Sequence, residues 1–143
     1  MSGRNAIRAT GLVVDHATLS GPLRVLDCPV LEIAGGSSLA ITGPSGCGKS
    51  TLLCLLAGLA APTQGQVSIG STDLSALSDA GRAAFRKGAI GVVYQADNLL
   101  PFLTVAENVR LQLALCADTR DADRRVADLL DGLGLGEIGR AHV

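Results

Sequence analysis

The chain has 143 residues, of which 48% are hydrophobic, 17% charged and 2% aromatic, and its net charge is −1. A surface that follows nucleic-acid phosphates needs an excess of basic residues, so this charge argues against nucleic acid as a partner. The longest nearly pure apolar run, Leu52–Ala61, is about half as long as the roughly 20 residues of a membrane span. Residues 1–10 lack the apolar block of a signal peptide. The composition predicts a folded intracellular domain that does not cross the bilayer.

The first half of the sequence alternates strand-like segments with one helical segment. Strands are predicted at Ile7–Val14, Val30–Ile33, Leu39–Thr42 and Gln66–Ile69, and a helix at Lys49–Ala57. Gly58 and Pro62 follow the helix and are typical of its end.

The second half of the sequence carries clearer helix-start signals. Ser78 is expected to cap a helix over Asp79–Arg86, and Ile90–Tyr94 is apolar enough for a buried strand. Thr104 and Glu107 have the spacing of a capping box, in which the hydroxyl and the carboxylate satisfy each other's backbone N–H groups. A last helix is predicted over residues 122–133. Strands that alternate with helices indicate an α/β fold with a largely parallel sheet.

The four cysteines give no sign of a metal or redox site. They form no C-x-x-C pair, and they stand at positions 28, 47, 54 and 116. Zinc ligands and redox dithiols have characteristic close spacings, so these residues are expected to be free thiols in a reducing compartment.

Residues 43–51 read GPSGCGKST and match the pattern G-x-x-x-x-G-K-[ST] of a phosphate-binding P-loop. The pattern lies between an apolar strand-like segment and a helical segment, which is the context that a P-loop needs, and Lys49 is one of only two lysines. The candidate phosphate-binding residues are Gly43, Ser45, Gly46, Cys47, Gly48, Lys49, Ser50 and Thr51.

The residue types fit the chemistry of a bound triphosphate. Glycines let successive backbone N–H groups turn toward the anion, and the start of the following helix adds partial positive charge. Lys49 is expected to neutralise the β- and γ-phosphate oxygens, Ser50 to give a hydroxyl ligand to Mg²⁺, and Thr51 to bond near the α-phosphate. A P-loop alone does not distinguish GTPases, small-molecule kinases and transport ATPases.

Several later stretches resemble the ATP-binding subunits of ATP-binding cassette (ABC) transporters. Residues 52–65 are similar to that family's "LLxxLAGLxxPTxG" continuation, residues 90–95 to its strand ending in the Q-loop glutamine, and residues 98–109 to its "NLLPxLTxxENV" stretch. The last stretch is most like the exporter branch that handles lipoproteins and macrolides. The resemblance extends from about Ile7 to the end of the sequence.

The resemblance implies a function, a fold and further site residues. It implies an ATPase that binds ATP and Mg²⁺, with Lys49 and Gln95 as catalytic residues and with Ser50 and Gln95 at the metal. His16 falls where the family has an aromatic residue that stacks on adenine. The implied fold has a P-loop core with N-terminal antiparallel strands and the Q-loop over residues 1–95, and the beginning of a helical subdomain over residues 96–143. The implied partners are a second ATP-binding subunit and a membrane-spanning permease, which would hold the protein at the inner face of the plasma membrane.

Parts of the family pattern do not occur in these residues. No LSGGQ signature and no hydrophobic strand ending in Asp-Glu follows Gln95. We expect a partial sequence of a full ATPase that hydrolyses ATP only at background rates on its own; the alternatives are a naturally short nucleotide-binding or interaction module without hydrolysis, and a P-loop small-molecule kinase.

Overall fold

The computed structural model describes residues 5–96, 98–116 and 120–137. The chain divides into two units, one up to Ile90 and one from Gly91 onward. The expected division into residues 1–95 and 96–143 stays a prediction. In the described residues no helix is both long and apolar enough to cross a membrane.

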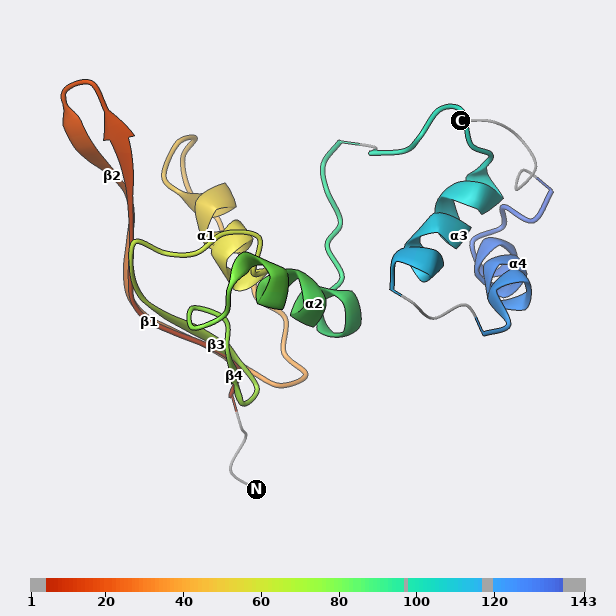
Figure 1. Cartoon of the computed structure of the whole chain (residues 1–143), viewed down its shortest axis with the longest axis horizontal. Coiled ribbons are helices and arrows are strands. Elements are labelled where there is room, and N and C mark those ends of the chain that lie inside the picture. The colour runs from red at the N-terminus through yellow and green to blue at the C-terminus, as the bar shows by residue number, and fades with distance from the viewer. Residues whose placement is uncertain (1–4, 97, 117–119, 138–143) are drawn as a thin grey trace. The chain divides into compact units, whose positions relative to one another are not determined.

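The first unit is built on a four-stranded antiparallel sheet (Figure 1). Its strands are β1 (Asn5–Thr18), β2 (Gly21–Ala34), β3 (Gln64–Ile69) and β4 (Thr72–Asp73), in the spatial order β2-β1-β3-β4. β1 and β2 form a long hairpin, with Thr18 opposite Gly21. The α/β class and the N-terminal antiparallel strands expected from the sequence are confirmed.

Two glycines come close together where the pairing of β1 and β3 is irregular. Gly65 approaches β1 so closely that a Cβ atom there would lie 2.2 Å from the carbonyl oxygen of Gly11. The β1–β3 register shifts by one residue in this region, between Thr10 and Val13. Ala9 points into the core before the shift, and Leu12 and Val14 do so after it. The irregularity keeps an apolar face toward the core because it reverses the alternation of side chains.

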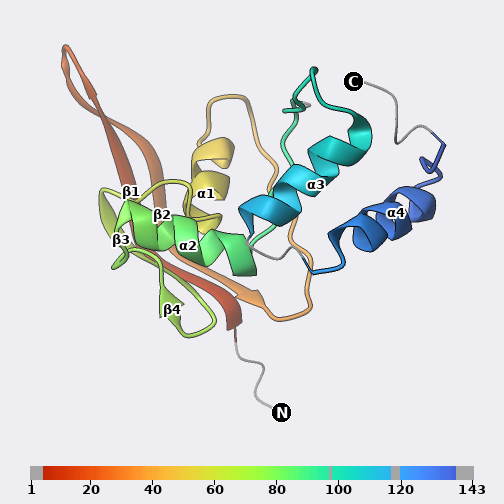
Figure 2. The same cartoon turned by 45° about the vertical axis from the view of Figure 1, so that its right-hand side comes forward.

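Two helices of the first unit lie on the same side of the sheet (Figure 2). They are α1 (Lys49–Leu56) and α2 (Asp79–Ala89). The core joins Leu55 and Leu56 of α1 to the inward residues of the sheet, with Phe85 of α2 packed against it. α2 begins as the sequence predicts, since the Ser78 hydroxyl accepts a hydrogen bond from the Gly81 N–H at 3.1 Å.

The second unit holds two helices, α3 (Val105–Leu115) and α4 (Ala122–Gly132). The predicted capping box is confirmed. The Thr104 N–H donates to the Glu107 carboxylate at 2.7 Å, and the Glu107 N–H donates to the Thr104 hydroxyl at 3.2 Å. Arg110 of α3 pairs with Asp123 of α4 at 2.6 Å and links the two helices.

The two predicted core strands outside the antiparallel sheet are not formed. Leu39–Thr42 and Ile90–Tyr94 have no strand structure, and the side chain of Val93 is 98% exposed instead of buried. Apolar residues form a buried parallel strand only when neighbouring strands supply hydrogen bonds on both sides. The residues that the structure describes include no parallel neighbour for either segment, so the prediction of a largely parallel sheet is wrong for this part of the fold.

Candidate phosphate-binding site

The segment of residues 43–48 curls into the start of α1. Three glycines of this segment have positive φ angles: Gly43 at 153°, Gly46 at 80° and Gly48 at 89°. Gly48 is the N-cap residue of α1. These backbone angles are cheap for glycine and strained for other residues, which explains the spacing of glycines in the loop.

Gly48 is also fixed by the sheet beside it. A Cβ atom at this position would lie 2.7 Å from the Val25 carbonyl oxygen and 3.4 Å from a methyl group of Leu26. Both residues belong to β2. The loop can approach β2 this closely only because residue 48 has no side chain.

Lys49 places its charge inside the curl of the loop. Its ammonium group donates hydrogen bonds to the carbonyl oxygens of Gly43 at 2.8 Å and Pro44 at 2.6 Å, and lies 3.7 Å from the Cys47 sulfur. An ammonium has three donors, so these contacts hold a positive charge at the centre of the loop.

The start of α1 is suited to an anion. Its N-cap, Gly48, has no side chain to accept from the first N–H groups, and the first turn of α1 contains no acidic residue. These N–H groups and the helix dipole therefore remain for a negatively charged group. Ser45, Cys47 and Ser50 are exposed, so the loop is open to a ligand. The predicted phosphate-binding residues thus meet in one place, and their donors fit a polyphosphate.

His16 is exposed near the end of β1, and its backbone is opposite Leu23 of β2. Val25, which contacts the loop at Gly48, is two residues further along β2. The backbone of His16 therefore lies one strand spacing (~4.8 Å) from β2 and about two residues (~7 Å) along the strand direction from Val25, where the loop meets the sheet. Residue 16 of β1 and the phosphate-binding loop therefore both lie beside the same stretch of β2.

Gln95 is exposed and belongs to the second unit. Ser50 belongs to the first unit, so the metal site predicted for these two residues spans both units and stays a prediction. Among the described residues, no three His, Cys, Asp or Glu side chains lie close enough together to hold a metal ion.

A polar network near His16 was not found by sequence reasoning. The Asp15 N–H donates to the Thr63 hydroxyl at 3.0 Å, and the Thr63 N–H donates to the Val13 carbonyl at 2.8 Å. Arg24 bridges the carboxylates of Asp15 at 3.1 Å and Asp27 at 3.2 Å. The hydrogen bond and charge of Asp15 are the main causes that raise the pKa of Arg24. Thr63 stands in the "PTxG" stretch, but that pattern alone does not reveal its partners.

Asn108 is a second residue that sequence reasoning missed. Its side chain is buried and accepts from the Leu100 N–H at 2.9 Å. Its amide group donates to the carbonyls of Leu100, Leu103 and Thr104 at 3.1, 3.3 and 3.0 Å. One side chain therefore fixes the shape of the loop before α3.

The glycine-lined loop, the central lysine and the open helix start together make a P-loop. The family model described as "ABC transporter" matches residues 27–143. The chain belongs to the ABC transporter family, as the sequence resemblance indicates.

Similar proteins agree with this family. The chain is 44% identical over 131 residues to the lipoprotein-releasing system ATP-binding protein LolD of Xanthomonas axonopodis pv. citri, covering 91% of this chain and 54% of the relative. It is 39% identical over 127 residues to the uncharacterized ABC transporter ATP-binding protein Mb2593 of Mycobacterium bovis, covering 88% and 38%. The chain thus spans about half the length, or less, of the curated relatives it matches.

A solved structure has the same fold. The ATP-binding cassette MJ0796, described as a dimer in a post-hydrolysis state bound to ADP and Pi, superposes with a TM-score of 0.85 at 30% identity. The match covers 95% of this chain and 60% of that chain.

Proposed function

We propose that this protein binds ATP with Mg²⁺ and, as part of a complete ABC ATPase, hydrolyses ATP to drive transport across a membrane. The observation that carries the proposal is the loop of residues 43–48, with the Lys49 ammonium held at its centre by two carbonyl oxygens at 2.8 and 2.6 Å. Its relatives are named as ATP-binding proteins, and the MJ0796 cassette is described with ADP and Pi bound. These names support the choice of ATP over other polyphosphates.

The predicted site residues would hold the nucleotide by different means. The N–H groups of Gly46, Cys47 and Gly48 would donate to phosphate oxygens, and Lys49 would leave the loop carbonyls to bind the β- and γ-phosphates. The Ser50 hydroxyl, together with Gln95, would hold Mg²⁺, which neutralises charge on the same phosphates. Gly43 and Ser45 would shape the loop, Thr51 would bond near the α-phosphate, and His16 would stack on the base.

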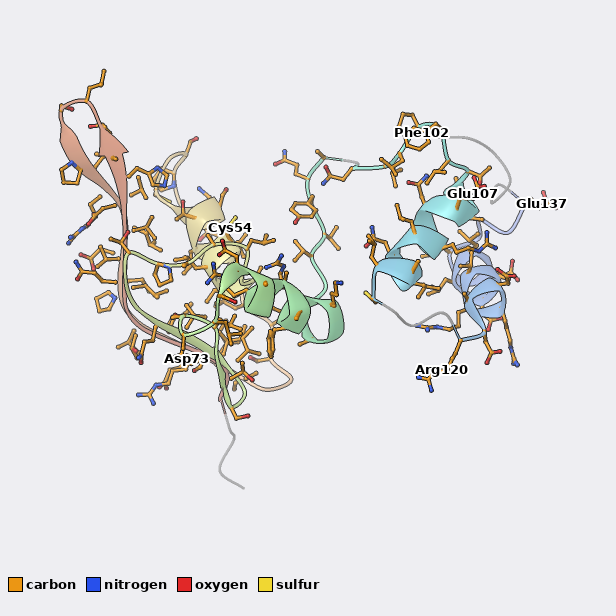
Figure 3. The ribbon with its side chains drawn as sticks, viewed as in Figure 1. Cys54, Asp73, Phe102, Glu107, Arg120 and Glu137 are labelled. Atoms are coloured by element: carbon orange, nitrogen blue, oxygen red, sulfur yellow. The ribbon has the colours of Figure 1, made fainter. Side chains whose placement is uncertain are left out.

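The loop before α3 is the proposed contact with a membrane-spanning permease. Its apolar side chains Leu99 and Phe102 are 47% and 71% exposed, and Asn108 fixes the backbone between them and α3. Figure 3 shows Phe102 and Glu107 at the N-terminal end of α3. Exposed apolar side chains on a rigid loop are suited to docking against another protein. This contact would place the protein at the inner face of the plasma membrane.

The proposal includes a second ATP-binding subunit and an export direction. The MJ0796 cassette is described as dimeric, which supports pairing of two such subunits. The LolD relative is described as part of a lipoprotein-releasing system, and its 44% identity over 131 residues supports the lipoprotein and macrolide exporter branch.

The Lys49→Ala variant of the complete gene product tests the proposal. Each charge-assisted hydrogen bond contributes about 1.5–3 kcal/mol, so removing the ammonium should weaken binding of Mg-ATP by about ten- to a hundredfold. The control is Lys87→Ala, which removes the other lysine, an exposed residue of α2. Titration calorimetry compares the three proteins. Equal ATP affinity in wild type and Lys49→Ala would refute the proposed site.

Hydrolysis is tested separately from binding. Phosphate release from ATP by the complete gene product, reconstituted with its partners, is expected to be lost in Lys49→Ala and kept in Lys87→Ala. Tight ATP binding without phosphate release would favour the module that binds nucleotide without hydrolysis. Transfer of the γ-phosphate to a small molecule would instead favour a kinase.

A further inference from the structure

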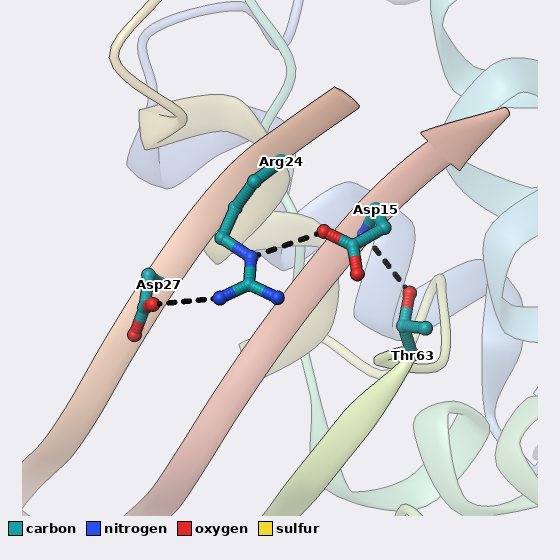
Figure 4. Close-up of polar contacts among 4 residues, drawn as sticks. All are labelled: Asp15, Arg24, Asp27 and Thr63. Carbon is teal, nitrogen blue, oxygen red and sulfur yellow. Dashed lines mark hydrogen bonds and ion pairs between the residues drawn. The ribbon is translucent and has the colours of Figure 1, made fainter. Parts of the chain in front are cut away.

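Thr63 joins two parts of the first unit that contribute to the nucleotide site. It follows α1, the helix that begins with Lys49 and Ser50, after a turn of a few residues. Its hydroxyl accepts from the Asp15 N–H at 3.0 Å, and its own N–H donates to the Val13 carbonyl at 2.8 Å. These two hydrogen bonds hold the turn against β1 immediately before His16. Figure 4 shows the first of them, between Asp15 and Thr63.

The backbone at this point of β1 is irregular. The β1–β2 register shifts between Val14 and Asp15. At an irregularity a strand loses regular ladder bonds, so its direction depends on other contacts. The Asp15 N–H donates to a side chain, the Thr63 hydroxyl.

The side chain of Asp15 is held from the opposite strand. Arg24 of β2 donates from Nε to the Asp15 carboxylate at 3.1 Å and from Nη1 to Asp27 at 3.2 Å (Figure 4). The next residue of β2, Val25, is the one whose carbonyl lies against Gly48. The backbone and side chain of Asp15 are therefore fixed by Thr63 on one side and by a strand in contact with the P-loop on the other.

We propose that Thr63 is a positioning residue for the nucleoside half of ATP: its two hydrogen bonds set the end of β1, and with it His16, at a fixed distance from the P-loop. Arg24 supports the same geometry through Asp15. This inference rests on the proposed function, because it requires that the P-loop holds the phosphates and that His16 faces the base. It assigns no contact between Thr63 and the nucleotide.

A positioning role predicts a selective loss. Tripolyphosphate has the phosphate chain of ATP without ribose or base, so it reports on the P-loop alone. Replacing Thr63 by Val keeps the shape of the side chain and removes the hydroxyl acceptor. One lost neutral hydrogen bond corresponds to about a two- to tenfold change in affinity. Thr63→Val is expected to weaken Mg-ATP binding by this factor and to leave Mg-tripolyphosphate binding unchanged.

The experiment measures both ligands by calorimetry on the complete gene product. Thr63→Ser, which keeps the acceptor, is expected to bind both ligands like the wild type. His16→Ala is expected to weaken ATP binding only, and Thr63→Val added to His16→Ala is expected to cause little further loss, because two residues that act through one contact are not additive. Full additivity of the two substitutions would overturn the inference.

Other outcomes separate the inference from the proposed function. If Thr63→Val weakens both ligands equally, or neither, or if Thr63→Ser behaves like Thr63→Val, Thr63 has only a structural role. If Lys49→Ala leaves both affinities unchanged, the proposed function itself fails and the inference fails with it. If Thr63→Val does not fold, Arg24→Gln replaces it, because it changes an exposed ion pair that holds Asp15. Arg24→Gln must then weaken binding of Mg-ATP and leave binding of Mg-tripolyphosphate unchanged. An equal loss of affinity for both ligands overturns the inference.

Discussion

Gly48 lies directly against β2: a Cβ atom at residue 48 would come within 2.7 Å of the Val25 carbonyl oxygen. A backbone oxygen cannot move aside as a flexible side chain can. The P-loop and the β1–β2 hairpin are therefore in contact at the residue where α1 begins, and the glycine is required for that contact as well as for its φ angle of 89°.

Gly48→Ala is accordingly expected to displace the loop from β2. The substitution combines a strained φ angle with the overlap at Val25, so we expect nucleotide affinity to fall by more than tenfold, which is about 1.4 kcal/mol or more. The matched control is Gly88→Ala in α2, where a Cβ atom would meet nothing within 4 Å. That change is expected to stabilise the fold by up to about 1 kcal/mol. Nucleotide titration and thermal unfolding measure both variants; unchanged affinity in Gly48→Ala would contradict the packing argument.

The stability contributed by Arg24 is expected to be independent of pH in ordinary buffers. The interactions with Asp15 and Asp27 raise the pKa of its guanidinium group. A pKa raised in the folded state stabilises the fold at all pH values below the ordinary one, and this contribution is lost only as the pH rises through the folded-state value. Denaturant unfolding of wild type and Arg24→Gln should therefore differ by the same amount from about pH 6 to about pH 9. A difference that disappears toward the alkaline end would show that another group is responsible.

Thr104→Ala is expected to destabilise the start of α3. The Thr104 hydroxyl accepts from the Glu107 N–H at 3.2 Å, and loss of such a cap costs about 1 kcal/mol. Thr104→Ser keeps the acceptor and should be nearly neutral. Hydrogen exchange at the Glu107 amide distinguishes the two variants. Equal protection in Thr104→Ala and the wild type would mean that the capping box does not hold in solution.

Asn108→Ala is expected to loosen the loop before α3. The substitution removes four hydrogen bonds and leaves the part-buried Leu100 N–H without its acceptor, which costs about 1–3 kcal/mol. The Leu100 amide should exchange faster with solvent, since its acceptor is the Asn108 side chain. Gln112→Ala, at an exposed position of the same helix, is the control and should leave this amide protected. Similar exchange rates in both variants would argue against Asn108 as the support of the loop.

Phe102→Ser is expected to weaken association with the proposed permease. The side chain is 71% exposed on the fixed loop, and an apolar anchor of this kind contributes to binding when a partner covers it. Co-purification of the complete gene product with its permease measures the loss. Leu129→Ser changes a side chain that is 52% exposed on α4 and serves as the control. If both variants retain the permease equally, the loop before α3 is not the docking surface.

Features that depend on neighbouring residues were predictable from the sequence. The cap at Ser78, the capping box at Thr104 and Glu107, and the start of α1 at Lys49 all occur where the sequence indicates them. Each is settled by hydrogen bonds or backbone preferences within a few positions, so the amino-acid types suffice.

Strand formation was less predictable, because a strand depends on partners that are distant in sequence. Val92, Val93 and Tyr94 have the composition of a buried strand, yet they are 39%, 98% and 53% exposed. Composition shows that a segment can be buried, whereas burial itself requires neighbouring strands, and the described residues supply none there.

The sequence by itself indicated the P-loop, because the glycines, the lysine and the hydroxyl residues stand within nine consecutive positions, where their spacing forms a local pattern. Only the tertiary structure decided that Gly48 contacts Val25 and that Thr63 bonds to Asp15, 48 residues away. Both contacts depend on strand register and on an irregularity in β1, which arise from the packing of the whole first unit and leave no local pattern in the sequence.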